Sequence, residues 1–293
     1  MYYIVYGFLY ALSLLPLRIL YLFSDIIYMV VYYLIGYRKD VVMRNLLIAF
    51  PEKTEKERIR IAKNFYLNLV DAFIESIKMI TISKKEVQKR TDGDFEIINN
   101  LISEGRNIHI LVGHQFNWEF ANLLYALNLK IPFVGIYMPI SNKIIDRIFY
   151  HFRERFGTVL ISATSFRSKM HTVFDKQYML ALAADQSPSA PGSGFWMNFF
   201  NKPVPFVIGP AKGAVKNNTA VVYVSFKKIK RGFYQFKATL IANNGADYTP
   251  EQLTVFYKNE LEKAIRDDPA NYLWSHKRWK WEWDEAYRSK WAE

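Results

Sequence analysis

Residues 107–119, with the sequence NIHILVGHQFNWE, decide the fold of this chain. Their first six residues form a short apolar run that is typical of a buried strand, and Gly113 ends the run. A helix is predicted over residues 118–129, directly after Asn117, whose side chain is of a type that caps helix N-termini. A strand that passes through a glycine turn into a helix is the repeating unit of an α/β sheet, and functional groups gather at the carboxyl ends of its strands.

The same alternation continues on both sides of this stretch. Short apolar or alternating runs predict further strands at residues 131–137, 178–183, 220–226 and 233–241, the last of which is expected to pair antiparallel at an edge. Apolar spacing, with a capping box in the last case, predicts helices at residues 54–80, 145–152 and 249–266. We therefore expect an α/β fold with a mostly parallel central sheet flanked by helices, preceded by an N-terminal membrane helix or helical hairpin.

The composition excludes several classes of protein. The chain has 293 residues, of which 51% are apolar and 23% are charged, so it is neither intrinsically disordered nor fibrous. It contains no cysteine, which excludes disulfides, thiolate catalysis and cysteine-ligated metal sites. The 39 Lys and Arg residues outnumber the 27 Asp and Glu residues, and the resulting charge of +12 suits an anionic partner such as a lipid headgroup, an acidic protein or a nucleic acid.

The N-terminal segment, residues 1–37, has the pattern of a membrane anchor. It contains only two charges, Arg18 and Asp25, and Pro16 interrupts its apolar sequence. The uncharged stretch before Arg18 is near the lower limit of about 17 apolar residues for a span. Two arrangements remain, a single tilted transmembrane helix and a helical hairpin inserted into one leaflet. The alternative is a buried helix pair in a soluble core, against which the many N-terminal tyrosines argue.

Cations follow this segment at once, at Arg38, Lys39 and Arg44. Such residues bind anionic headgroups and hold the following domain on the cytoplasmic side of a membrane. We expect two domains, a membrane anchor over residues 1–37 and a catalytic α/β domain over residues 38–293. A stretch rich in Ser, Pro and Gly follows the third predicted strand and is expected to form a loop over the site.

His114 and Glu119 are the residues best placed for chemistry. With His114 in the turn before a helix and Glu119 in the first helical turn, the ring can fold back onto the carboxylate. A carboxylate on one ring nitrogen fixes the tautomer and raises the basicity of the other nitrogen, which is what a general base needs to remove a proton from a hydroxyl. The alternative is a histidine satisfied by a loop carbonyl, with Glu119 favoured by the helix dipole.

Basic clusters occur at residues 227–231 and 276–280, and tryptophans surround the second one. Stacking on nucleic acid is one interpretation of this pattern. An aromatic belt at a membrane interface agrees better with the N-terminal anchor, so we expect no nucleic-acid partner. The sequence also has no glycine-rich dinucleotide or Walker loop and no serine nucleophile elbow.

Together, several segments resemble the blocks of a known family. The chain is similar over nearly its whole length to the late acyltransferases of lipid A biosynthesis, the lauroyl and myristoyl acyltransferases, within the broader His-x4-Asp/Glu glycerolipid acyltransferase superfamily. Its signature block is Gly113-His114 with Asn117-Trp118-Glu119. The other similar segments are LLPLR at 14–18, RNL at 44–46, AFP at 49–51, Tyr137 with Pro139, Asn142, Asp146-Arg147, ADQ at 184–186, Phe199-Phe200, GPA at 209–211, Asp268-Pro269, YLW at 272–274, His276 and Arg278-Trp279.

The resemblance implies an acyl transfer at a membrane. His114 would deprotonate an acceptor hydroxyl and Glu119 would orient it. The hydroxyl, on a lipid A precursor, would attack an acyl thioester carried by acyl carrier protein or by coenzyme A. No metal and no cofactor are expected, and the location would be the cytoplasmic face of the bacterial inner membrane. The residues expected to bind substrates are Asn117, Arg147, Asp185, Gln186, His276 and Arg278.

One position departs from the family's pattern. Met138 lies between Tyr137 and Pro139, where the family usually has a cation. Arg147 is then expected to carry more of the phosphate binding, because a guanidinium group can bind phosphate through two hydrogen bonds. Two other functions stay open, an acyltransferase for another acceptor such as a lysophospholipid, aminolipid or glycolipid, and a catalytically silent lipid-binding homologue.

Overall fold

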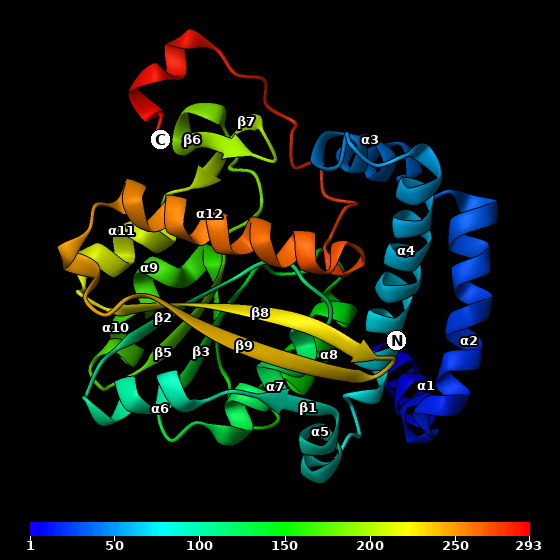
Figure 1. Ribbon diagram of the computed structural model, residues 1–293. Helices are drawn as coiled ribbons and strands as arrows, with labels where there is room; N and C mark the ends of the chain where they lie inside the picture. The colour runs from blue at the N-terminus through cyan, green and yellow to red at the C-terminus, as the bar shows by residue number, and fades with distance from the viewer.

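A seven-stranded sheet forms the centre of the protein, with the strand order β1-β9-β8-β2-β5-β3-β4 (Figure 1). The computed structural model describes the backbone of residues 1–293 and every side chain except that of Arg167. The strands from β8 to β4 are parallel, whereas β9 runs antiparallel to β8 and β1 lies parallel to β9. The strands of this sheet are β1 Thr91–Gly93, β2 Ile108–Val112, β3 Phe133–Tyr137, β4 Val159–Ser162, β5 Met179–Ala183, β8 Ala220–Lys230 and β9 Phe233–Ala242, and a separate hairpin consists of β6 Gly194–Phe199 and β7 Lys202–Val207.

Helices cover both faces of the sheet, with α11 and α12 on one face and α6 and α7 on the other (Figure 1). The α-helices are α1 Tyr2–Leu14, α2 Leu17–Met29, α3 Lys39–Ala49, α4 Glu55–Lys78, α5 Lys84–Arg90, α6 Glu96–Ser103, α7 Trp118–Asn128, α8 Lys143–Glu154, α9 Phe166–Lys169, α10 His171–Phe174, α11 Gly209–Lys216 and α12 Pro250–Asp267. A π-helical segment, Val30–Ile35, extends α2, and short 3-10 helices lie at Ala163–Ser165, Pro191–Ser193, Gly245–Asp247, Pro269–Asn271 and Glu285–Lys290.

The central strand β2 is buried on both faces. Ile108 and Ile110 pack in the apolar cluster that contains α6 and α7, while Leu111 packs in the cluster that contains α11 and α12. Successive side chains of a strand point to opposite faces, so a strand covered on both sides needs apolar residues at consecutive positions. This requirement explains the largely apolar run, interrupted only by His109, that β2 shows before Gly113.

The predicted fold class is confirmed. β2, β3, β5 and β8 form at the predicted runs, and α4, α7, α8 and α12 form at the predicted helical segments. Thr249 and Gln252 make the expected capping box of α12. The expectation that residues 233–241 form an edge strand was wrong, because β1 pairs with the outer side of β9 and places Thr91 opposite Tyr234.

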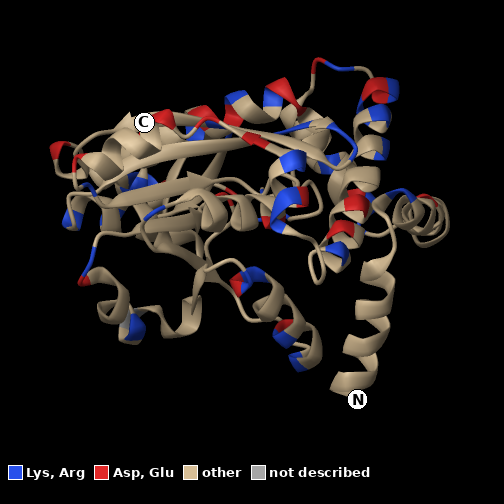
Figure 2. Cartoon of the chain, turned by 90° about the horizontal axis from the view of Figure 1, so that it is seen from below, with Lys and Arg blue, Asp and Glu red and all other residues tan. Residues whose placement is uncertain are grey.

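The N-terminal residues form two helices, because Pro16 lies at the N-cap of α2. α1 contains no charged residue (Figure 2). α2 lies alongside α4 (Figure 1), and the continuous helix Leu17–Ile35 is long and apolar enough to cross a membrane, with a mean hydropathy of 1.6 and 17% of it buried. Its length and composition therefore agree with the predicted membrane helix.

One side of α2 is nevertheless polar and is bonded to the rest of the protein. Ser24 Oγ donates a hydrogen bond of 2.7 Å to Asp71 on α4. Asp25 forms an ion pair of 2.7 Å with Arg231, in the turn between β8 and β9. The residues of α2 with exposed apolar side chains include Leu22, Phe23, Ile26 and Ile27. α2 therefore has one face that is held by the protein and another face that is free and apolar.

Gly113, at the end of β2, is required by the close approach of α12. A Cβ atom at this position would overlap Cδ1 of Leu261, whose side chain is fully buried. We predict that Gly113→Ala lowers the free energy of unfolding by about 1–3 kcal/mol through overpacking. Leu261→Ala in the wild-type background should cost about 2–5 kcal/mol, and less in the Gly113→Ala background because the overlap is then relieved. Chemical denaturation of the four variants measures this, and strictly additive costs would contradict the explanation.

Candidate active site

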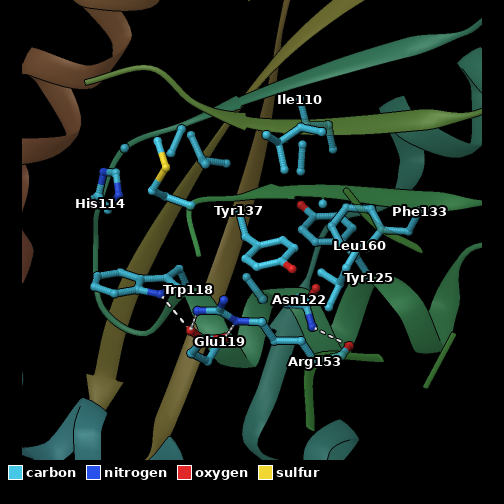
Figure 3. Close-up of a pocket in the computed structure, with 18 of the residues that line it drawn as sticks. Ile110, His114, Trp118, Glu119, Asn122, Tyr125, Phe133, Tyr137, Arg153 and Leu160 are labelled. Atoms are coloured by element: carbon cyan, nitrogen blue, oxygen red, sulfur yellow. Dashed lines mark hydrogen bonds and ion pairs between the residues drawn. The ribbon is translucent and has the colours of Figure 1, made fainter. Parts of the chain in front are cut away.

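A cavity of about 350 Å³ opens at the carboxyl edge of the sheet. α7 forms one wall, and β2, β3, β4 and β5 form the other. Figure 3 shows His114 and Trp118 at one end of the cavity and Tyr125 and Phe133 at the other. The residues that make the interior apolar include Ile110, Ala121, Phe133, Gly135, Leu160, Ala181 and Phe226. The cavity thus has a polar mouth and an apolar interior.

The carboxylate that binds His114 belongs to Asp185. Nδ1 of His114 lies 2.6 Å from Oδ1 of Asp185, and the backbone N–H of His114 donates a hydrogen bond of 2.9 Å to Oδ2. Val112 of β2 lies opposite Ala183 of β5, so His114 and Asp185 follow their two paired strands at the same offset. Asp185 is only 1% exposed, whereas the ring of His114 is partly exposed.

The two groups shift each other's protonation in the direction that a general base requires. Burial lowers the pKa of His114, but the charge and hydrogen bond of Asp185 outweigh burial and leave the pKa above its usual value. Burial raises the pKa of Asp185, but the charge and hydrogen bonds of His114 bring it below its usual value. Asp185 therefore stays ionised and accepts a hydrogen bond from the protonated Nδ1 of His114. Nε2 of His114 carries no proton and accepts a hydrogen bond of 3.3 Å from Gln186. Nε2 is the free base of the pair.

Glu119 does not contact His114 in the described structure, and that expectation was wrong. Arg153 on α8 donates two hydrogen bonds to Glu119, one of them from Nε at 2.8 Å. Trp118 Nε1 donates a third at 3.1 Å. Burial lowers the pKa of Arg153, but the Glu119 charge and hydrogen bond raise it overall. The reason for the error is directional, since Glu119 in the first turn of α7 faces α8, whereas the ring of His114 faces the end of β5.

Several residues expected to bind substrates contact the protein itself. Asn117 is 1% exposed, and its Oδ1 accepts a hydrogen bond of 3.0 Å from the backbone of Glu119, so it caps α7. Arg278 is also 1% exposed, and its guanidinium donates to the carbonyl of Pro205 at 3.0 Å. Asp185 is buried against His114, as described above. Burial removes all three side chains from direct contact with a ligand in the cavity.

Two of the C-terminal residues hold the loop that begins at Gln186. His276 Nε2 accepts a hydrogen bond of 3.1 Å from the backbone of Ser187, and Ser187 Oγ donates to the carbonyl of Arg278 at 2.8 Å. Burial, followed by the charge of Arg278, lowers the pKa of His276 to about 4, so the ring is neutral and accepts this bond. Gln186 lines the cavity next to His114, which is the position expected for this loop.

Arg147 lies away from the cavity mouth. Its guanidinium lies 4.3 Å from the centre of the Tyr2 ring on α1, and its Nε is 3.4 Å from His151. Met138 lines the mouth and is 69% exposed. Among the described side chains, the arginine that lines the cavity is Arg153. The structure thus corrects the expectation that Arg147 is the cation beside His114.

The C-terminal segment is bonded to the turn between β2 and α7, residues 113–117, which is called the catalytic turn below. The backbone N–H of Leu273 donates to the carbonyl of His114, and that of Phe116 donates to the carbonyl of Asn271, both at 3.1 Å. Asn45 on α3 donates to two carbonyls of the same segment at 2.7 Å each. These contacts hold the backbone from His114 to Phe116, although their residues are far apart in the sequence.

Sequence reasoning did not identify Arg153, and it assigned Asp185 to substrate rather than to His114. Arg153 was detectable only as a cation near the end of a predicted helix, and nothing local connects it to Glu119. Among the residues whose side chains are described, no group of three His, Asp or Glu lies close enough to hold a metal ion. The polar groups that the structure brings together at this site are a histidine with its carboxylate, the amide of Gln186 and the Glu119–Arg153 pair.

Known proteins are similar to this chain over most of its length. The family model described as bacterial lipid A biosynthesis acyltransferase matches residues 1–281. The chain is 25% identical over 233 residues to a lipid A biosynthesis acyltransferase of Haemophilus influenzae, covering 78% of this chain and 72% of that protein. It is 22% identical over 246 residues to the lipid A biosynthesis palmitoleoyltransferase of Escherichia coli strain K12, covering 83% and 79%. Because the family match extends over nearly all of the residues that build the cavity and the catalytic turn, this chain belongs to the bacterial lipid A biosynthesis acyltransferases.

Proposed function

We propose that this acyltransferase moves a fatty acyl chain from an acyl thioester to a hydroxyl group of a lipid A precursor. The observation that carries the proposal is the His114–Asp185 pair at the mouth of an apolar cavity. The pair supplies a base that can deprotonate a hydroxyl, and the cavity supplies a dry environment for a hydrocarbon chain. Family membership supports the choice of acceptor.

His114 carries the proton through the reaction. Nε2 takes the proton of the acceptor hydroxyl while the hydroxyl oxygen bonds to the thioester carbonyl carbon. The carbonyl electron pair moves onto its oxygen and gives a tetrahedral oxyanion. When this intermediate collapses, the C=O bond re-forms, the C–S bond breaks and the His114 imidazolium returns the proton to the departing thiolate. Asp185 stays ionised and stabilises the imidazolium between the two transfers.

Gln186 and Glu119 have supporting roles in this mechanism. The amide nitrogen of Gln186 lies 3.3 Å from Nε2 of His114, so it borders the place where the oxyanion forms. A hydrogen-bond donor at that place stabilises the developing charge. Glu119 acts through Arg153, which it holds at the cavity wall. This assigns Glu119 to positioning rather than to orientation of the base.

The acyl chain occupies the cavity between α7 and the sheet. Each buried methylene contributes about 0.8 kcal/mol, so a chain is held by length more than by specific contacts. Tyr125 and Phe133 close the end that lies opposite His114 in Figure 3. Their rings limit how far a chain can enter while its thioester stays beside Nε2.

The N-terminal helices place the enzyme on the membrane that contains its acceptor. We assign residues 1–37 to the anchor and residues 38–293 to the acyltransferase domain, at the cytoplasmic face of the inner membrane. The bonds of α2 to Asp71 and Arg231 favour a helical hairpin in one leaflet over a spanning helix, because a span would separate these polar groups from their partners.

The donor is an acyl carrier protein or coenzyme A, and the charge of +12 favours the acidic carrier protein. A second candidate function is transfer to a less anionic lipid such as a lysophospholipid. It is favoured by Met138, an apolar residue at the cavity mouth. It is also favoured by Arg147, whose guanidinium packs against the Tyr2 ring instead of lining the cavity. Parallel assays with a phosphorylated lipid A precursor and with a lysophospholipid decide between the two acceptors.

The first prediction concerns the base and its partner. His114→Ala should lower kcat/KM for acyl transfer to the lipid A precursor by about 10²–10⁴. His114 must be neutral to accept a proton, so activity rises with pH through its pKa, which Asp185 keeps above the usual value. Asp185→Asn should therefore lower the rate and move the acid limb of the kcat/KM profile to lower pH. Glu119→Gln, the control, should leave the acid limb in place. An acid limb that moves in Glu119→Gln but not in Asp185→Asn would show that Glu119, and not Asp185, sets the pKa of His114.

The second prediction concerns chain length. A Cβ atom at Gly135 would lie 3.4 Å from Leu160 Cδ2 and 3.5 Å from Thr158 Cγ2, so a small side chain fits there and reduces the cavity. We expect Gly135→Ala and, more strongly, Gly135→Val to shift the preference toward shorter acyl thioesters. Tyr125→Leu enlarges the far end and should shift it toward longer ones. Competition assays with mixed chain lengths measure the product ratio, and equal ratios in all variants would place the chain elsewhere.

The third prediction concerns the membrane. Phe8 and Ile26 expose 63% and 55% of their surface on α1 and α2. A charged side chain at such positions costs up to about 3 kcal/mol inside a bilayer, so Phe8→Asp and Ile26→Asp should reduce binding to anionic vesicles in flotation assays. Phe256→Asp is the matched control, because Phe256 is also exposed, at 39%, but lies on α12. Equal loss in all three variants would argue against an N-terminal anchor.

A further inference from the structure

A second buried carboxylate, Glu75 on α4, lies close to the catalytic turn and has no part in the mechanism above. Its side chain is 0% exposed. Tyr21 donates a hydrogen bond of 2.6 Å to Oε1, and Tyr234 and Asn117 donate bonds of 2.5 Å and 2.8 Å to Oε2. The three donors belong to α2, to β9 and to the catalytic turn. Glu75 thus joins three parts of the fold that are distant in the sequence.

The cost of burying a carboxyl group restricts the arrangement of the side chains around Glu75. A carboxyl group without partners is very costly to bury, and the three hydrogen bonds to Glu75 offset that cost. Burial raises the pKa of Glu75 above its usual value, and the bonds from Tyr21, Tyr234 and Asn117 offset only part of that shift. Loss of the carboxylate would leave an amide and two phenol hydroxyls buried without acceptors. The cluster therefore tolerates one arrangement of these side chains.

Asn117 connects this cluster to the active site. Its Oδ1 accepts the backbone N–H of Glu119 at 3.0 Å, and its Nδ2 donates to Glu75. Because both ends of the amide are bonded, the side chain cannot rotate without losing the cap of α7. The start of α7 places Trp118 and Glu119 at the cavity wall. Glu75 thus contacts the cavity wall beside His114 indirectly, through Asn117 and the first turn of α7.

We propose that Glu75 is a positioning residue for acyl transfer, which fixes the catalytic turn through Asn117 and joins it to α2 through Tyr21. The inference rests on the proposed function, since one of its readouts is acyl transfer. It makes the N-terminal helix part of the support of the active site in addition to its part in membrane binding.

Asp71 provides a matched control on the same helix, one turn before Glu75. It is also 0% exposed. Its side-chain partners are Ser24, Lys228, and Arg231, which belong to α2 and to the β8–β9 hairpin. Asp71→Asn therefore perturbs a buried carboxylate that also binds α2 but lies outside the chain of contacts to Asn117. Its folded fraction is expected to lose less kcat than Asn117→Asp, because Asp71 can affect the turn only through α2.

The test exchanges donor and acceptor between Glu75 and Asn117 in the full-length enzyme. Asn117→Asp keeps a good helix cap but replaces the amide donor to Glu75 with a second carboxyl group, and we expect kcat to fall about 10- to 100-fold through misplacement of the turn, with a smaller change in KM. The double variant Glu75→Gln/Asn117→Asp restores one donor opposite one acceptor and should recover most of the loss. Tyr21→Phe should lower kcat in the same direction, but less.

Hydrogen–deuterium exchange of the peptide spanning residues 114–122 gives a readout that does not depend on activity. We expect faster exchange in Asn117→Asp and restored protection in the double variant. Wild-type kcat in Asn117→Asp, or a double variant that recovers neither kcat nor protection, would overturn the proposal. Wild-type kcat in Tyr21→Phe would remove α2 from it. If the wild-type enzyme itself transfers no acyl chain, the proposed function fails, and the exchange pattern alone decides whether Glu75 positions the turn.

Discussion

The parallel pairing of β2 with β5 is the constraint on which the rest of the site depends. It sets Val112 opposite Ala183, and the chain then leaves both strands at the same edge. Two residues later on each strand, His114 and Asp185 meet at 2.6 Å. A register shift of one residue would turn every side chain of a strand to the other face. The base and its carboxylate are therefore specified by the same hydrogen bonds that hold the middle of the sheet together.

The protein also buries several other charged side chains, and removing each of them from water costs free energy. Asp71, Glu75 and Glu119 are at most 4% exposed, and each is bonded to donors from distant segments. Arg278 is fully buried with its guanidinium 4.1 Å from the centre of the Phe206 ring, and burial lowers its pKa. Buried charged and polar groups of this kind contribute little net stability compared with apolar residues of the same size. What they provide here is a fixed geometry, since removing one partner would leave the other uncompensated.

The sequence predicted those parts of the fold that depend on local pattern. β2 and α12 were found because one is a largely apolar run and the other has a capping box. β4 was not predicted because Val159–Ser162 is only four residues long, and the β6–β7 hairpin was missed because Pro203 and Pro205 argue against a strand. The prolines are tolerated there because β6 and β7 form a sheet of their own with two strands.

The candidate site was predictable only as far as His114. Its place between a strand, a glycine and a helix identified it as a functional residue. Its partner was not predictable, because Asp185 lies 71 residues further along the chain and the order of strands in a sheet is a tertiary property. The same limit applies to Glu119 and Arg153, which are 34 residues apart and meet only when α8 packs near α7. Spacing within one motif cannot reveal contacts of this kind.

The bonds of Asn271 and Leu273 to the catalytic turn have a consequence for the order of folding. Contacts between residues so far apart in sequence form late, because the entropy of closing a long loop opposes them until other structure has brought the ends together. The individual helices, which depend on contacts close in sequence, can therefore form before the turn around His114 is fixed. A molecule whose C-terminal segment is detached still carries the apolar helices but lacks an ordered base. The order of the turn around His114 is thus coupled to completion of the tertiary structure.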